Sequence, residues 1–404
     1  MAKRKQDAIA LNSINKKSYA SASAIANMVE YIRRHGMPQA SSRPTQYRAR
    51  KEICNKMTPY GTIVQKVSVP LAKGGDAMVS MQAPLPYFYH NCEQSITYAR
   101  IVREALRRKP STAAEPWNII IYQDGVDPSD MGAEHHTRSA CAWYWSFAEL
   151  GIYALGHEEM WGCICTLRKS EYNQFTGAIA GLFASLLGLF RGTHDIQLAG
   201  VTVVIDGEPV TILARVGVIF GDEPALKEML DCKGHAGIKP CLLCKNIVLR
   251  SSMDLYSFPP PMKTIACFNW NQLLLHNDDS IKATIKRVAH WAKELQAKRI
   301  THKEFGDRAG ILGWNNNPAH DILFGDKFNL QVASSVMYDW PHIYVHGGLA
   351  DVEMGLLMKK LAKRRSSCIR YTEARHDIYS EPIYIYIKGS QERATLIYYE
   401  VSEL

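Results

Sequence analysis

The chain has 404 residues, of which 47% are hydrophobic, so it can bury a core and form two or three structural units. Its net charge is +9, and residues 1–51 hold all of it, with eleven Lys and Arg against two acidic residues. A basic arm on a neutral body predicts a polyanionic partner, most simply nucleic acid. The alternative is a solvated, disordered tail.

Two features argue against a secreted or membrane-spanning protein. The opening residues, MAKRKQDAIA, lack the apolar stretch of a signal peptide, so the ten cysteines are expected as free thiols or metal ligands in a reducing compartment. The longest apolar run, Phe175–Phe190, is short for a membrane span and rich in Gly and Ala, which predicts a buried helix. The basic residues Lys3, Arg4 and Lys5 are a weak signal for nuclear import.

The first part of the chain is predicted to be mainly helical. Apolar residues at helical spacing predict helices near Ser21–Arg34 and over Glu93–Lys109. The prolines at 70, 84 and 86 predict an irregular stretch at 52–92. A short β-rich run, Asn118–Tyr122, then ends at Asp124 and Gly125.

The second half combines strands and helices. The β-branched runs Val201–Ile205 and Val210–Phe220 flank DGEP, a pattern typical of a hairpin. Pro224 lies near the first position of a predicted helix, PALKEML. Residues 270–305 are helical and moderately basic, whereas 366–404 are Tyr-rich and strand-like and do not continue the preceding pattern.

Composition divides the chain into six segments, and we find no internal repeat. These are a basic, partly disordered arm at 1–51, a helical and irregular lead-in at 52–115, a core at 116–250, a mainly helical insertion at 251–335, an apolar run with a D-x2-H motif and a following helix at 336–365, and a divergent tail at 366–404.

A cluster of possible metal ligands follows the predicted hairpin. Cys232, His235, Cys241 and Cys244 form the pattern C-x2-H-x5-C-x2-C. Thiolate and imidazole are the ligands of tetrahedral zinc, and an x2 spacing lets one tight turn offer two of them. Four protein ligands leave no open position, which predicts a structural rather than a catalytic zinc. The alternative is a reduced Cys pair in a loop, with His235 at the surface.

Two aspartates end predicted strands. Asp124 closes NIIIYQD, and Asp222 closes RVGVIFGD. Carboxylates at the ends of neighbouring strands can share Mg²⁺ ions, which orient a water or a 3′-hydroxyl in phosphodiester chemistry. The competing interpretation, and the commoner one for a single Asp, is a turn residue or helix cap.

A D-x2-H pair, Asp339 and His342, follows the apolar run SSVMY. By itself this pair fits a capped loop with a buried histidine. A zinc-protease site is excluded because no H-E-x-x-H occurs.

In this order the motifs resemble transposases of cut-and-paste DNA elements of the CACTA/Plavaka type. The resemblance covers roughly residues 115–360 and is sharpest in GDEPALKEML…CKGHAGIKPCLLCKN and YDWPH. It implies an α/β fold: an RNase H-like mixed sheet with helical insertions and a zinc-stabilised loop, in which two Asp and a Glu surround two Mg²⁺ ions.

The resemblance assigns roles to residues of this chain. Asp124 corresponds to the first metal-binding carboxylate and Asp222 to the second, while Cys241 and Cys244 match the family's Cys pair. Asp339 and His342 match a D-x2-H signature that shapes the site near DNA. The final Glu is not identified, because too little chain follows His342, and Glu353, Glu373 and Glu381 are all poorly placed.

The resemblance therefore predicts a nuclear DNA transposase that cleaves and joins strands with Mg²⁺ or Mn²⁺ and acts as a homo-oligomer, or a truncated, inactive copy of one. The alternative is a non-catalytic, zinc-containing nucleic-acid-binding protein, and a third hypothesis is an unused reading frame that folds poorly. Phosphate contacts are expected from the arm, at Lys3, Arg4, Lys5, Arg33, Arg34, Arg48, Arg50 and Lys51.

Overall fold

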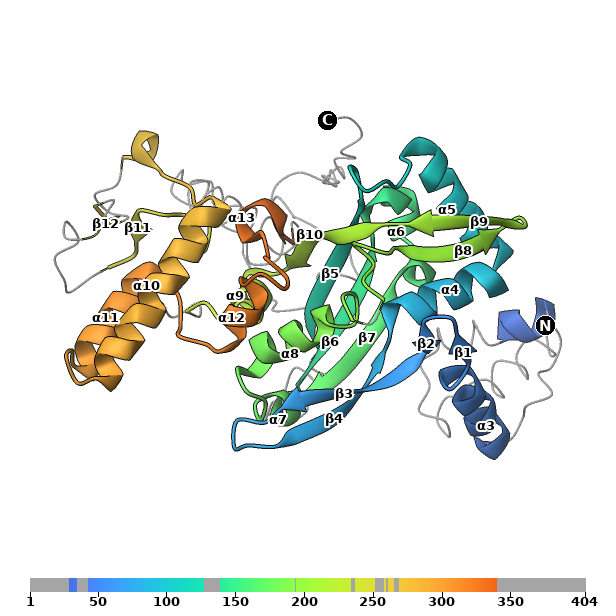
Figure 1. Ribbon diagram of the computed structural model, residues 1–404, viewed down its shortest axis with the longest axis horizontal. Coiled ribbons are helices and arrows are strands. Elements are labelled where there is room, and N and C mark those ends of the chain that lie inside the picture. Colours follow the sequence, from blue (N-terminus) through green and yellow to red (C-terminus); the bar gives the residue numbers. More distant parts are fainter. Residues whose placement is uncertain are drawn as a thin grey trace, which may run out of the picture. The chain divides into compact units, whose positions relative to one another are not determined.

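The computed structural model describes residues 29–34, 43–126, 139–192, 194–233, 237–250, 258, 261–264 and 269–339 (Figure 1). The chain divides into two units, which we call the hairpin unit and the sheet unit. The hairpin unit comprises Met1–Ser68, Ala77–Pro116 and Gly188–Leu213, and the sheet unit comprises Val69–Asp76, Trp117–Leu187 and Ala214–Leu404.

The hairpin unit contains helices and short two-stranded sheets. Its elements are α3 (Arg43–Cys54), β1 (Met57–Thr58) with β2 (Gly61–Thr62), most of β3 (Val64–Pro70) with β4 (Asp76–Gln82), α4 (Pro84–Gln94), α5 (Ile96–Arg108), and β8 (Val201–Ile205) with β9 (Glu208–Ile212). The ends of β3 and β4 that Val69–Asp76 contains belong to the sheet unit. The prediction of an irregular stretch at 52–92 was therefore wrong. Pro84 lies at the start of α4, where a missing N–H costs nothing, so it begins a helix instead of breaking one.

Helix α5 confirms most of the helix predicted at Glu93–Lys109, although Glu93 and Gln94 belong to the end of α4. The hydroxyl of Ser95 accepts the N–H of Tyr98 and caps the first turn. Val102 and Ala105 are fully buried on one face, and Arg107 and Arg108 lie in the last turn, where positive charge complements the helix dipole.

Strands β8 and β9 confirm the predicted hairpin. Asp206 and Gly207 form its two-residue turn, and both have positive φ, as a type I′ turn requires. The second strand is shorter than predicted, because the run Val210–Phe220 is broken at Leu213. The Ser111 hydroxyl accepts the Leu213 N–H at 2.8 Å and donates to its carbonyl at 2.7 Å, so Leu213 has no backbone group left for a strand ladder.

The sheet unit is built on a five-stranded mixed sheet in the order β13-β10-β5-β6-β7. Strands β5, β6 and β7 form an antiparallel meander, and β10 and β13 add in parallel to the free side of β5. This confirms the predicted α/β class. The strands are β5 (Trp117–Val126), β6 (Ala140–Phe147), β7 (Gly162–Arg168), β10 (Ala214–Gly221) and β13 (Val336–Tyr338).

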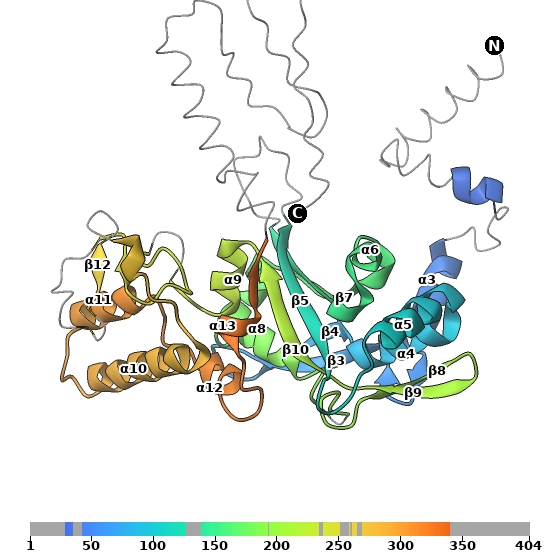
Figure 2. The same ribbon diagram turned by 90° about the horizontal axis from the view of Figure 1, so that it is seen from above.

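Helices cover this sheet. Figure 2 shows α8 (Ala178–Leu187) and α9 (Glu223–Met229) together beside β10 and β5. The apolar run at Phe175–Phe190 thus contains a buried helix, as predicted, and Phe183 stacks on Trp143 of β6 with ring centroids 5.5 Å apart. None of the described helices is both long and apolar enough to span a bilayer.

The remaining part of the sheet unit follows α9. It contains β11 (Ile247–Val248), β12 (Lys263–Thr264), α10 (Asp278–Gln296), α11 (His302–Leu312), α12 (Ala319–Leu323) and α13 (Val332–Ser335), with α6 (Ile152–Leu155) and α7 (Lys169–Tyr172) earlier in the chain. Helices α10 and α11 account for the helical pattern predicted at 270–305.

Candidate functional site

The two aspartates predicted as metal ligands lie at the same edge of the sheet. β5 and β10 are neighbouring parallel strands, and Phe220 pairs with Tyr122. Continued by two residues, this register brings Asp222 opposite Asp124. Asp124 shares the face of Tyr122, because side chains two residues apart in a strand share a face. The Asp222 carboxylate instead caps α9 and lines a cavity together with Gln123.

Asp339 follows the third strand at this edge. Tyr338 of β13 pairs with Gly221 of β10, and the Asp339 N–H donates to the Gly221 carbonyl at 2.8 Å. Asp339 is 7% exposed. Asp222 and Asp339 therefore each follow a strand directly, although the sequence pattern grouped Asp339 only with His342. The prediction that Asp124 closes its strand was wrong, because β5 continues to pair with β6 as far as Val126. His342 lies outside the described residues.

All three carboxylates affect the pKa of Tyr122. Burial raises the pKa of its hydroxyl, and the negative charges of Asp124, Asp339 and Asp222 raise it further. The phenol therefore stays protonated and acts as a hydrogen-bond donor to Asp124. A cation bound at this edge of the sheet would offset these negative charges.

Asp222 also has a structural role. Its carboxylate accepts the N–H of Ala225 at 2.7 Å and caps helix α9, with Pro224 in the first turn. The helix-cap interpretation is thus confirmed for Asp222. Within the described parts of the chain, no three His, Cys, Asp or Glu side chains lie close enough to hold a metal ion.

A cavity of about 280 Å³ opens beside Asp222, and its lining includes Gln123, Lys169 and Glu228. Burial and the charge of Asp222 raise the pKa of Glu228, while Lys169 lowers it. The Oε1 atom of Gln123 is buried, and no described group hydrogen-bonds to it. Our sequence reasoning missed both residues. The available signal was the position of Glu228, six residues beyond Asp222 on the predicted helix.

The predicted zinc ligands begin directly after α9. Cys232 is buried and its backbone bridges to Trp314. Cys241 and Cys244 are hydrogen-bonded to each other, and the Leu243 N–H donates to the Cys241 sulfur at 3.4 Å. These donors lower the pKa of Cys241, whereas its partner Cys244 has a raised pKa. His235 lies outside the described residues.

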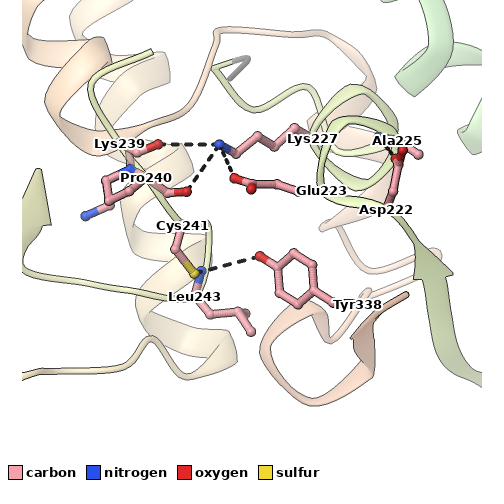
Figure 3. A network of polar contacts seen from close by, with 9 residues as sticks. All are labelled: Asp222, Glu223, Ala225, Lys227, Lys239, Pro240, Cys241, Leu243 and Tyr338. Atoms are coloured by element: carbon pink, nitrogen blue, oxygen red, sulfur yellow. Dashed lines mark hydrogen bonds and ion pairs between the residues drawn. The ribbon is translucent and has the colours of Figure 1, made fainter. Parts of the chain in front are cut away.

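Two buried lysines surround these cysteines. The Nζ of Lys227 lies 3.5 Å from the carbonyl oxygens of Lys239 and Pro240 and 2.6 Å from Glu223, so it ties α9 to the cysteine loop (Figure 3). Burial lowers the pKa of Lys239 to about 8, although Cys244 and Cys241 act in the opposite direction. Positive charge beside the thiols favours thiolate, the form that binds metals.

One residue connects the cysteine loop with the aspartate edge. Tyr338 immediately precedes Asp339, and its hydroxyl lies 3.8 Å from the Cys241 sulfur (Figure 3). Cys232, in turn, follows the helix that Asp222 caps. The loop is therefore fixed to the two elements that carry Asp222 and Asp339.

The basic arm is only partly described. Arg33 and Arg34 both pair with Glu30, at 2.9 and 2.8 Å. Arg48, Arg50 and Lys51 are exposed on α3. The other arm residues named above, Lys3, Arg4 and Lys5, lie outside the described residues.

Comparison of the sequence with protein-family models and with curated proteins gave no match.

Proposed function

We propose that the chain is a transposase-like protein whose RNase H-like domain cleaves and joins DNA strands with Mg²⁺ or Mn²⁺. The observation that carries this proposal is that Asp124, near the carboxyl end of β5, and Asp222, directly after β10, come from neighbouring parallel strands of a mixed sheet. This is the arrangement that the sequence resemblance implies. A DNA substrate also accounts for the basic arm, and we propose that the protein acts in the nucleus.

The donor set fits a hard divalent cation, because carboxylate oxygens are the ligands that Mg²⁺ prefers. Asp124 and Asp222 would hold the ions, and Asp339 follows the adjoining strand, β13. Bound metal supplies an activated water or 3′-hydroxyl and stabilises the leaving oxygen. The residues of the chain orient that centre: the α9 cap fixes Asp222, and the Tyr122 hydroxyl donates to Asp124.

We also propose that Cys232, His235, Cys241 and Cys244 bind one structural zinc. The thiol donors suit zinc. Burial raises the pKa of the Cys232 thiol, and the positive charge of Lys227 lowers that pKa in part. Such a zinc would brace the loop against α9 and β13 without taking part in the reaction.

A non-catalytic nucleic-acid-binding protein is the second candidate. It is favoured by the cap role of Asp222 and by the absence, in the described residues, of a ready set of three metal ligands. Binding requires only charge, whereas catalysis requires all the carboxylates at one point.

Nicking of supercoiled plasmid in Mg²⁺ or Mn²⁺ tests the proposal. Asn caps helices as well as Asp does, so Asp222→Asn removes the charge while keeping the cap. The exposed Asp326→Asn is the matched control. We expect nicking by the unchanged protein and the control, and none by Asp222→Asn. Equal nicking by all three would reject the assigned site, and DNA binding without nicking would favour the second candidate.

A further inference from the structure

A second cavity, of about 360 Å³, opens in the sheet unit between the cysteine loop and α10. Lys239 and Lys245 line it from the loop, and Arg287 lines it from the helix. Met262 and Leu312 add an apolar part of the wall, and both are buried. None of these residues belongs to the aspartate edge described above.

The sequence of α10 creates this space. Ser280, Ala283, Thr284 and Arg287 recur at intervals of three and four residues and so share one side of the helix. The first three side chains are small, and only the fourth reaches far. The helix is held in place by its buried apolar residues, Ile281, Ile285 and Val288, and by its Asn277 cap.

The cavity carries positive charge that no described carboxylate pairs with. Three cations face one acidic residue, Asp279, and no ion pair joins Lys239, Lys245 or Arg287 to a carboxylate in the described ranges. Lys239 is 4% exposed, and its Nζ donates to the Lys245 carbonyl at 2.9 Å. Several cations that line one partly buried space without a carboxylate partner favour an anionic ligand.

We propose that this cavity binds a backbone phosphate of a DNA strand. The Arg287 guanidinium can donate two parallel hydrogen bonds to phosphate oxygens, and Lys245 and Lys239 add point charges. A bare phosphate would fill only part of the volume, and the apolar wall at Met262 and Leu312 suits the attached sugar or base. The inference rests on the proposed DNA function and gives it a specific anchoring point away from the aspartates.

The test compares two double variants of the full-length chain. Lys245→Ala/Arg287→Ala removes two charges from the cavity, and Lys286→Ala/Lys293→Ala removes two exposed charges from α10 outside it. Fluorescence anisotropy with a labelled DNA duplex measures affinity over a series of salt concentrations. We expect the cavity variant to bind about tenfold more weakly and to lower the salt slope by about 1, with little change in the control.

Equal losses in the two double variants would overturn the inference and leave only general attraction between charges. If the unchanged protein does not bind DNA at all, it is the proposed function that fails. Thermal unfolding of each variant separates a loss of binding from a loss of folding. We expect no loss of folding, because all four side chains are at least partly exposed.

A free nucleotide also carries a phosphate with an attached sugar and base, so it is the other ligand that could fill this cavity. Calorimetric titration with ATP distinguishes the two, using the same pair of double variants. ATP binding that the cavity variant abolishes, together with unchanged DNA affinity, would make the cavity a nucleotide site and overturn the DNA proposal. Weakened DNA binding, with ATP competing only weakly, supports it.

Discussion

Asp222 combines two roles that substitution can separate. Its carboxylate caps α9, and it is also the second candidate metal ligand. Asp222→Ala removes both, so we expect a loss of about 1 kcal/mol in the free energy of unfolding, measured with urea. Asp222→Asn keeps an acceptor for the Ala225 N–H and should cost far less. If Asn destabilised the fold as much as Ala, the cap would not be what Asp222 contributes to stability.

Buried His320 should make the stability of the protein depend on pH. It is buried against Trp314 and Phe324, and its Nε2–H donates to the Leu230 carbonyl at 2.9 Å. Burial lowers its pKa below the usual value of 6.5. The histidine of the unfolded chain then binds a proton more readily than buried His320 does. The contribution of His320 to the free energy of unfolding is therefore complete above about pH 6.5 and is lost as the pH falls below that value.

His320→Gln keeps a donor but cannot titrate in this range. We expect the unchanged protein to lose stability between pH 7.5 and 5.5 by up to about 1.4 kcal/mol per pH unit more than this variant. The exposed His302→Gln should follow the unchanged protein. Urea unfolding at the two pH values gives the comparison, and identical slopes for all three proteins would rule out His320 as the source.

At the scale of the element, the break between β9 and β10 depends on one hydroxyl. Ser111→Ala leaves the N–H and the carbonyl of Leu213 without their partner, so we expect a loss of about 1–3 kcal/mol in unfolding free energy. Ser111→Thr keeps the hydroxyl and serves as the control. Equal stability of the alanine variant and the unchanged protein would show that water replaces the hydroxyl fully.

This same hydroxyl shows the limit of sequence reasoning. Helix α5, strand β5 and the β8–β9 hairpin were predictable because their signals are local: a cap, a β-branched run and a DG turn. The break at Leu213 was not, because its cause lies 102 residues away in the chain. The site divides in the same way. The β-rich runs indicated Asp124 and Asp222, whereas the position of Asp339 depends on a three-residue strand whose pairing only the structure gives.

The cysteine loop yields a prediction about metal content. We expect roughly one zinc per chain by elemental analysis, because the ligand types and spacing suit a tetrahedral site. Cys241→Ser should lose it, and Cys163→Ser, an exposed cysteine on β7, should keep it. Metal-free protein whose cysteines alkylate freely while folded would contradict the zinc proposal.

At the scale of the whole molecule, the distribution of charge predicts how DNA is attracted. The net charge of +9 is all in residues 1–51, and Arg48, Arg50 and Lys51 are exposed on α3. Replacing these three by Ala should weaken binding to a DNA duplex and flatten its salt dependence. Replacing Lys286, Lys293 and Lys303 removes the same charge elsewhere. A larger loss from that second set would place the main DNA contact outside the arm.

The order of the strands also matters while the protein is being made. The β5–β6–β7 meander is complete once Arg168 has been synthesised, but β10, which covers the other side of β5, begins only at Ala214. In between, the ribosome produces α8 and a hairpin that belongs to the other unit. The growing chain therefore carries an open, strongly apolar strand edge for a defined interval, and such an edge pairs readily with other extended chains. We expect aggregation of nascent chains to be concentrated in that interval and to end when β10 adds to the sheet.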